Sequence, residues 1–279
     1  MQTVLSAGEG SERHILFDRS SALDIAAFVV AGIDLSPGTA IPSDGDPRID
    51  RALAGFLFTC GPDHIRHPEP VEGGGGRHYP LHGSLAGTPV TRTTMSAGGD
   101  RCSGAIEVDL ACGGRAAVER LWQIDEPTGS VTLSDRVINI GAAAFAPMMM
   151  YHMNIAGRLL GDDTRIESPS VEGGSLAWRF GEGESAHFCR KAVAGDGRWA
   201  EVALAALPGL QDRTLSVRFR TDTLPFLQMW RCQRGGANVI SIEPASHRLA
   251  KRPDLAAHGE LDRLEPGQSR SYALAFAVA

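Results

Sequence analysis

Four short segments of the sequence place polar, proton-exchanging side chains among apolar, strand-like residues. Burying such groups is costly unless they are hydrogen-bonded or paired, so each segment is a candidate for part of a functional site. Imidazole and carboxylate groups exchange protons, while indole and amide groups bind hydroxyl groups. The segments are residues 79–83, 151–154, 228–231 and 242–247.

The segment around His152 is expected to be an extended strand. On an extended backbone alternate side chains share a face, so His152 and Asn154 point the same way as Met148 and Met150. Tyr151 then lies on the opposite face. The pattern predicts that an imidazole and an amide are presented together.

Glu243 lies at the end of another strand-like run. Ile240 and Ile242 fall on one face of this run, and Ser241 and Glu243 fall on the other. Pro244 has no N–H group for the next ladder bond, so we expect the strand to end there. The carboxylate of Glu243 is therefore expected at a strand terminus facing a cleft.

Each of these residues also has a structural interpretation. A single histidine in an apolar strand is more often a hydrogen-bonded structural residue, and a glutamate before a proline is usually a solvated strand end. Trp230 is more often a core residue, although its ring beside Gln228 also suits the apolar face of a sugar. Taken singly, no residue is evidence of catalysis.

Alternation with a period of two residues recurs along the chain and predicts an all-β fold. In the C-terminal run Tyr272, Leu274, Phe276 and Val278 share one face. Helical periodicity is scarce, with one possible short helix at residues 49–56. We expect a large antiparallel β-sandwich forming a single domain over residues 1–279. Further strands are expected at residues 14–18, 23–30, 106–110, 120–124, 131–140, 147–155, 215–219, 227–231 and 239–243.

Charge and cysteine usage exclude several classes of protein. The 279 residues carry a formal net charge of -6 without a basic cluster, which argues against nucleic-acid and membrane-surface partners. Residues 1–13 lack the apolar run of a secretory signal, and the longest apolar stretch is interrupted by Asp24 and Asp34. The five cysteines have no Cys-x-x-Cys spacing, which predicts reduced thiols in a cytoplasmic protein.

Several motifs in this order resemble the aldose 1-epimerase (galactose mutarotase-like) superfamily. The central ones are Pro80-Leu81-His82-Gly83, the run Tyr-His-Met-Asn-Ile-Ala-Gly at 151–157, and Ile242-Glu243-Pro244. Together with Asp18-Arg19, Thr59-Cys60-Gly61 and the run at 135–141, they look like a less characterised bacterial branch. The resemblance extends from about residue 14 to the C-terminus.

The resemblance implies the supersandwich fold of that superfamily and an isomerase that interconverts sugar anomers. It assigns the general acid to His152, the general base to Glu243 and a sugar-holding role to His82, with no metal or organic cofactor. Asn154, Trp230 and Gln228 are expected to contact a small sugar or sugar derivative. The sequence departs from the superfamily pattern at Ser84, where an arginine is common, and in the close spacing of His152 and Asn154.

Two other functions compete with this one. His82, His152, His247 and Glu243 could converge on a metal in a cupin-like sugar isomerase, although the close His-x-His spacing of cupins is absent. Alternatively, the sandwich could be a carbohydrate-binding or regulatory module without turnover. The mutarotase interpretation predicts that His152 and Glu243 line one cleft, with His82 on its wall and Trp230 at its border.

Overall fold

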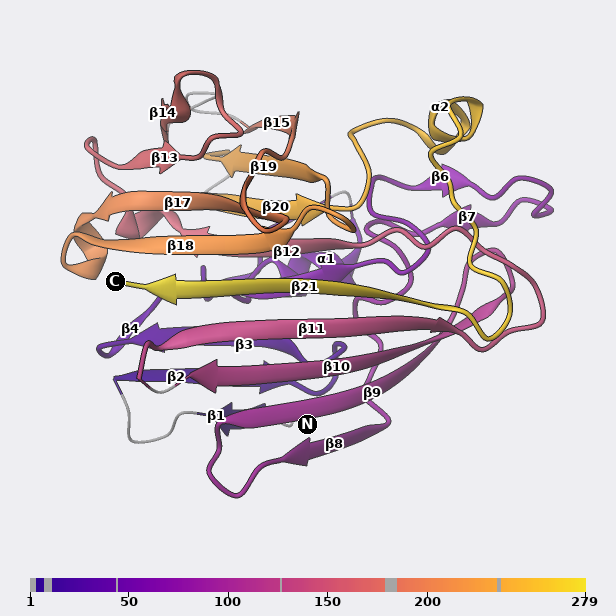
Figure 1. Cartoon of the computed structure of the whole chain (residues 1–279), viewed down its shortest axis with the longest axis horizontal. Helices are drawn as coiled ribbons and strands as arrows, with labels where there is room; N and C mark the ends of the chain where they lie inside the picture. Colours follow the sequence, from indigo (N-terminus) through magenta and orange to yellow (C-terminus); the bar gives the residue numbers. More distant parts are fainter. Residues whose placement is uncertain (1–3, 8–11, 44, 126, 179–184, 235–236) are drawn as a thin grey trace.

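Two large antiparallel sheets pack face to face in the computed structural model (Figure 1), which describes residues 4–7, 12–43, 45–125, 127–178, 185–234 and 237–279. Within these residues the first sheet has nine strands. In spatial order they are β1 (Val4–Ala7), β2 (Arg13–Asp18), β3 (Asp24–Val30), β5 (Leu57–Cys60), β12 (Met150–Ala156), β20 (Val239–Ala245), β19 (Phe226–Cys232) and β15 (Ser185–Lys191), with β4 (Ile33–Asp34) beside β3.

The second sheet has ten strands within the same described ranges. In spatial order they are β14 (Ser175–Ala177), β13 (Arg165–Glu167), β17 (Trp199–Leu207), β18 (Arg213–Arg220), β21 (Ser269–Val278), β11 (Ser130–Asn139), β10 (Arg115–Asp125), β9 (Arg101–Asp109) and β8 (Arg92–Met95), with β16 (Ala194–Asp196) beside β17. A small hairpin joins β6 (Glu69–Pro70) to β7 (His78–Tyr79). This architecture confirms the predicted all-β antiparallel sandwich.

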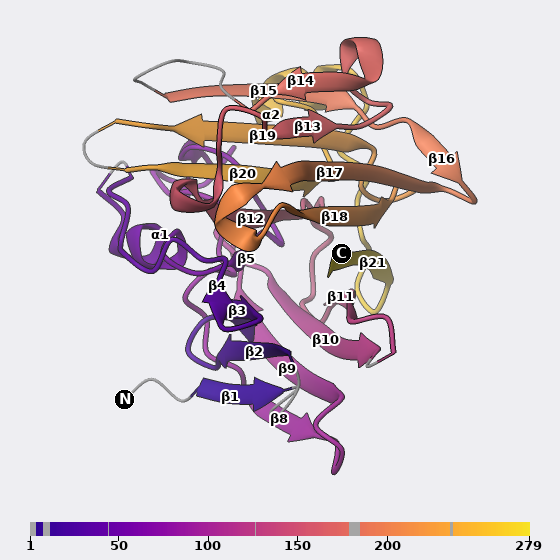
Figure 2. The ribbon, with the colours of Figure 1, turned by 90° about the vertical axis from the view of Figure 1, so that its left-hand side faces the viewer.

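Helices are few and short in the described part of the chain. They are α1 (Pro47–Ala52), α2 (Arg252–Ala257) and 3-10 turns at Gly157–Leu159, Glu172–Gly174 and Pro208–Leu210. The expected helix at 49–56 is thus displaced towards the N-terminus, because Asp46 caps it and Pro47 occupies its first turn. Figure 2 shows α1 on the side of the first sheet that faces away from the second. None of the described helices is long and apolar enough to cross a membrane.

Burial differs between the two sheets. Strands of the second sheet, such as β10 and β21, alternate between buried and more exposed residues, which is the pattern of a sheet with one solvated face. Every residue of β12 and β20 is buried. These central strands are covered by the inter-sheet core on one side and by loops on the other.

Two hydrophobic clusters correspond to the two sides of the first sheet. The larger lies between the sheets and includes Tyr151, Met153 and Ile242. The smaller includes Met150 and Phe58 and packs against loop and helix residues of the outer face. The predicted division of residues 148–155 into two faces is therefore confirmed.

Pro244 does not end its strand, so that prediction was wrong. β20 continues to Ala245, and Pro244 pairs with Leu227 of β19. Proline removes only one donor, and the neighbouring residues keep both adjacent strands in register. Glu243 consequently lies inside the sheet instead of at a strand terminus.

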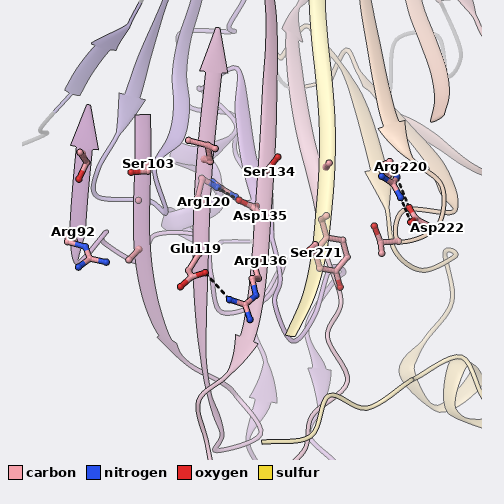
Figure 3. A pocket seen from close by; sticks show the side chains of 17 residues that line it. Arg92, Ser103, Glu119, Arg120, Ser134, Asp135, Arg136, Arg220, Asp222 and Ser271 are labelled. Atoms are coloured by element: carbon pink, nitrogen blue, oxygen red, sulfur yellow. Dashed lines mark hydrogen bonds and ion pairs between the residues drawn. The ribbon is translucent and has the colours of Figure 1, made fainter. Parts of the chain in front are cut away.

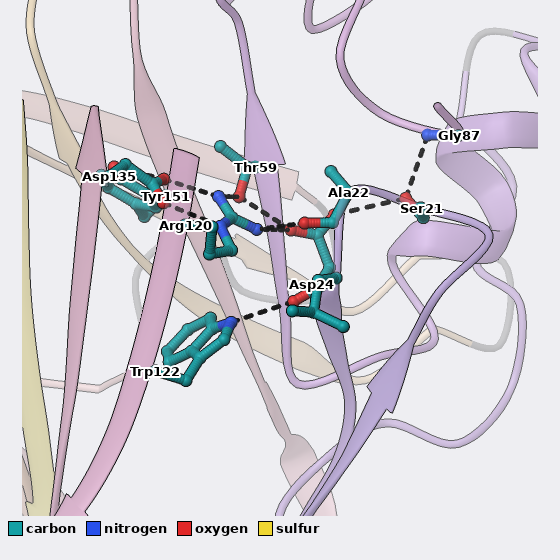
Figure 4. A network of polar contacts seen from close by, with 10 residues as sticks. Ser21, Ala22, Asp24, Thr59, Gly87, Arg120, Trp122, Asp135 and Tyr151 are labelled. Atoms are coloured by element: carbon teal, nitrogen blue, oxygen red, sulfur yellow. Dashed lines mark hydrogen bonds and ion pairs between the residues drawn. The ribbon is translucent and has the colours of Figure 1, made fainter. Parts of the chain in front are cut away.

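A buried ionic network connects the two sheets (Figure 4). Arg120 of β10 contacts Asp135 at 2.6 Å, Asp24 at 2.7 Å and the Thr59 hydroxyl at 2.7 Å, and Tyr151 of β12 donates to Asp135 at 2.9 Å. Burial raises the pKa of Asp24, against the opposing effect of Arg120. The network fixes β12 against the second sheet one residue before His152.

All five cysteines lie in the described ranges, and each is a free thiol, as predicted.

Candidate active site

The register of the first sheet brings the predicted site residues together on its outer face. The pairing of β12 with β20 sets Met150 opposite Ala245 and Met153 opposite Ile242, and His152 and Glu243 lie between these two pairs. On the other side of β20, Gln228 pairs with Glu243 and Trp230 pairs with Ser241. Adjacent strands therefore supply an imidazole, a carboxylate, an amide and an indole to one patch.

His152 and Glu243 are in direct contact. Nε2 of His152 lies 3.2 Å from Oε1 of Glu243, and their side chains are 5% and 1% exposed. Nδ1 of His152 lies 2.7 Å from Oδ1 of Asn154, whose amide nitrogen donates to the Gly55 carbonyl at 3.0 Å. This orientation of Asn154 requires the proton on Nδ1, so Nε2 faces the carboxylate.

Two further side chains hold the carboxylate of Glu243. The Ser241 hydroxyl donates to Oε1, and the Gln228 amide donates to Oε2 at 2.5 Å. Ser241 precedes Glu243 by two residues on the same strand face, as the alternation of residues 239–243 predicts. Its contact with the carboxylate follows from the side-chain conformations and was not predicted.

Burial favours the neutral forms of both groups in the contact. It lowers the pKa of His152 to about 4, against the opposing hydrogen bond to Asn154. It also raises the pKa of Glu243, although Ser241, His82 and Gln228 act in the opposite direction. Burial thus shifts the two pKa values in opposite directions, and two groups in such close contact titrate as a coupled pair.

His82 approaches the pair from a loop whose backbone is tightly constrained. Its φ is 58°, and that of Gly83 is 86°. A Cβ on Gly83 would lie 2.2 Å from the His64 carbonyl oxygen, so only glycine fits this turn. Arg48 of α1 donates to the Ala86 carbonyl at 2.8 Å and holds the same loop.

The His82 ring packs edge-on against His152, with centroids 5.6 Å apart. Its Nδ1 lies 3.2 Å from the Ile65 carbonyl oxygen and so carries the proton. Burial, and secondarily the neighbouring His152, lowers the pKa of His82 to about 3. A neutral His82 therefore has Nε2 as an acceptor for a hydroxyl group.

Trp230 lies beside the pair on the outer face, outside the inter-sheet core. Its ring is half-buried, its centroid is 5.9 Å from that of His152, and its Nε1 donates to the Ser185 hydroxyl at 2.6 Å. Phe58 of β5 stacks on His152 with centroids 4.7 Å apart. Phe58 was not predicted, because its place next to His152 depends on the pairing of two strands far apart in sequence.

His247, proposed as a metal ligand, is engaged elsewhere. Its Nδ1 bonds to the Ser246 hydroxyl at 2.7 Å and its Nε2 to the Glu260 carbonyl at 2.9 Å. Within the part of the chain that the structure describes, no three His, Cys, Asp or Glu side chains form a metal-binding group. The ligand set of the cupin-like alternative does not assemble in these residues.

One groove of the surface adjoins the site, and another lies away from it. One of about 610 Å³ has Phe58, Gly55, Asp24 and Arg48 in its walls, so it adjoins the residues that contact His152 and Asn154. The other, of about 590 Å³, crosses the second sheet and is lined by charged and small residues (Figure 3). Neither includes the His152–Glu243 contact, so the predicted common cleft stays a prediction.

Comparison with solved structures identifies the architecture as a galactose mutarotase-like sandwich, as the sequence motifs predicted. A candidate aldose 1-epimerase from Klebsiella pneumoniae has a TM-score of 0.77 at 16% identity, over 99% of this chain and 82% of that one. Another candidate from Escherichia coli K12 has a TM-score of 0.69 at 15% identity, over 100% and 99%. A galactose mutarotase-like protein from Lactobacillus casei has a TM-score of 0.70 at 12% identity, over 99% and 100%.

The chain belongs to the family described as Domain of unknown function (DUF4432), whose model matches residues 5–278. A search of curated proteins finds no match to the sequence. The likeness to solved structures, all at low identity, establishes the fold.

Proposed function

We propose that the protein is an aldose 1-epimerase-like isomerase that interconverts the anomers of a small sugar or sugar derivative in the cytoplasm. The observation that carries this proposal is the contact of 3.2 Å between Nε2 of His152 and Oε1 of Glu243. Anomer exchange needs one group that gives a proton and one that takes a proton within reach of the same carbon. The free thiols support a reducing compartment.

In this mechanism the sugar binds to the form of the pair in which His152 is protonated on both nitrogens and Glu243 is ionised. Glu243 then takes the proton from the anomeric hydroxyl while His152 donates its Nε2 proton to the ring oxygen. The C1–O5 bond breaks, and the sugar opens to the aldehyde. Rotation about C1–C2 presents the other face of the carbonyl, and the reverse transfers close the ring as the other anomer. Every proton that is transferred in ring opening is returned in ring closure, so the reaction needs no further reactant.

The resting contact gives the sugar a defined way to bind. The ring oxygen accepts from Nε2 and the anomeric hydroxyl donates to the carboxylate, so the two sugar oxygens replace the contact between the side chains. Ring closure returns each proton to the group that started with it, and after release of the sugar the two side chains meet again. The enzyme therefore resets without exchange with bulk water.

The surrounding residues have supporting roles in this proposal. Asn154 fixes the tautomer of His152, and Ser241 and Gln228 orient the carboxylate by hydrogen bonds. His82 accepts a sugar hydroxyl at Nε2. Trp230 offers its ring to the apolar face of the sugar.

Anomer exchange measured by NMR over a panel of aldoses, deoxysugars, uronic acids and sulfonated sugars tests the proposal. We expect at least one sugar to exchange far faster than the uncatalysed reaction under the same conditions. Tight binding of a sugar with exchange at the uncatalysed rate would contradict it and would indicate a carbohydrate-binding module.

A further inference from the structure

The contact between His152 and Glu243 is almost completely covered by other side chains. The two residues are 5% and 1% exposed, and Oε2 of Glu243 also accepts a hydrogen bond from Gln228. A sugar that exchanges its anomers brings two of its oxygens to Nε2 of His152 and to the carboxylate. Part of the cover therefore has to move before the sugar reaches the pair.

Three aromatic rings contact the His152 ring within the described part of the chain, and the Phe58 ring cannot move easily. Phe58 stacks on His152 with centroids 4.7 Å apart, whereas His82 and Trp230 meet it edge-on at 5.6 and 5.9 Å. Phe58 pairs with His152 across β5 and β12 and is 1% exposed inside the outer-face cluster. Its ring is fixed by the sheet and by close packing.

The second ring, that of His82, is fixed by its backbone. The His82 N–H donates to the Arg66 carbonyl at 2.8 Å, and Nδ1 of the ring bonds to the Ile65 carbonyl at 3.2 Å. The next residue, Gly83, occupies a turn that only glycine fits. Moving the His82 ring aside would break this loop.

The third ring, that of Trp230, is held much less firmly. Its Nε1 donates to the Ser185 hydroxyl at 2.6 Å, and this is the side-chain hydrogen bond that the indole makes among the described residues. Ser185 is exposed, and it is the first residue of β15, the last strand of the first sheet. Water competes for a hydrogen bond at an exposed site, so its rupture has a small net cost.

We propose that Trp230 is the gate of the candidate site and that Ser185 is its latch, a positioning residue that holds the indole beside the His152–Glu243 contact. Rotation of the Trp230 side chain to another rotamer breaks the bond to Ser185 and uncovers the pair without moving β19. The displaced ring then offers its face to the apolar side of the sugar. The inference rests on the proposed function only for the identity of the molecule that enters.

Modification of histidines by diethyl pyrocarbonate tests the gate without a sugar. The reagent acylates an unprotonated imidazole nitrogen, which in His152 is Nε2, so it has to pass the same cover. Peptide mass spectrometry at pH 7 gives the rate at each histidine. In the wild type His152 should react far more slowly than the exposed His258, and the fully buried His64 reports any general opening of the fold.

The variants Ser185→Ala and Trp230→Phe remove the same hydrogen bond from its two sides. Each should accelerate the modification of His152 by about 2- to 10-fold, the range that corresponds to the loss of one hydrogen bond. The double variant should react no faster than the faster single variant, because both substitutions break one bond. Ser185→Thr keeps the hydroxyl group and should keep the wild-type rate.

Ser134→Ala is the matched control, because exposed Ser134 lies on β11 of the second sheet. This variant should modify His152 at the wild-type rate. The rates at His258 and His64 should be the same in every variant. Circular dichroism and thermal melting verify that each variant is folded.

Modification of wild-type His152 as fast as that of His258 would overturn the gate. So would an unchanged His152 rate in either Ser185→Ala or Trp230→Phe, or an equal acceleration of His152 and His64. NMR anomer exchange reads the fate of the proposed function separately. A gated His152 in a protein that exchanges no sugar of the panel would reject the isomerase and retain the gate, and exchange by a protein with an ungated His152 would do the reverse.

Discussion

The contact between His152 and Glu243 is the main chemical feature of the site at the residue scale. Two buried groups with opposite pKa shifts, in contact through Nε2 and Oε1, can hold an acid and a base in one unit. Asn154 is the residue that fixes which histidine nitrogen faces the carboxylate. The effect of Asn154 on the pair can be measured from the pH dependence of the reaction rate.

We expect kcat/KM to fall at acidic pH, where His152 and Glu243 are both protonated and neither can accept a proton. Burial lowers the pKa of His152 to about 4. The midpoint of the acidic limb of the pH–rate profile should therefore lie well below the ordinary histidine pKa of about 6.5. Replacing Asn154 by Leu removes a bond that stabilises the protonated ring. The limb should then move to still lower pH, and kcat should fall because the tautomer is no longer fixed.

NMR exchange rates from pH 3.5 to 8, corrected for the uncatalysed reaction, measure the acidic limb in the wild type and in Asn154→Leu. An acidic limb near pH 6.5 in the wild type, or a shift to higher pH in Asn154→Leu, would contradict this account of the pair.

At the scale of elements, β12 and β20 position the acid and the base, and the Arg120 network holds β12 against the second sheet. Arg120 is completely buried between two carboxylates. Removing one partner of a buried ionic group leaves uncompensated charge, at a typical cost of about 3–5 kcal/mol. The network therefore contributes to the precise placement of the strand that carries His152.

Arg120→Met should lower the free energy of unfolding by about 3–5 kcal/mol, as measured by urea denaturation. Arg115→Met is the control, because exposed Arg115 pairs with exposed Glu107 and should change the stability by less than about 1 kcal/mol. Similar effects of the two substitutions would show that the network has no special structural role.

Much of this arrangement follows from alternation along single strands. The shared face of His152 and Asn154, and that of Ser241 and Glu243, could be predicted because side chains alternate regardless of the partner strand. Phe58 and the Arg120 network could not be predicted in this way. Their contacts depend on which strands are neighbours and on how loops cover the outer face.

At the scale of the whole molecule, we propose that the chain forms a single domain. The inter-sheet cluster takes residues from Ile15 to Val278, so N-terminal and C-terminal segments share one core. We expect tryptophan fluorescence and far-ultraviolet circular dichroism to report coincident urea transitions. Two separated transitions would indicate independently folding units.

The central claim is that Glu243 is the base of anomer exchange, and Glu243→Gln tests it most directly. Glutamine keeps the shape and hydrogen-bonding reach of the side chain but cannot accept the proton. With the sugar that the wild type turns over, the NMR exchange rate should fall by about 10²–10⁴-fold while sugar affinity changes little. His152→Asn should cause a similar loss, and the double variant should lose less than the product of the two because acid and base act together.

Glu201→Gln is the control for that measurement, because this exposed glutamate lies on β17 of the second sheet. Its exchange rate should equal that of the wild type. The account predicts a folded Glu243→Gln protein that binds the sugar and no longer exchanges its anomers. A Glu243→Gln protein with nearly wild-type exchange would contradict it.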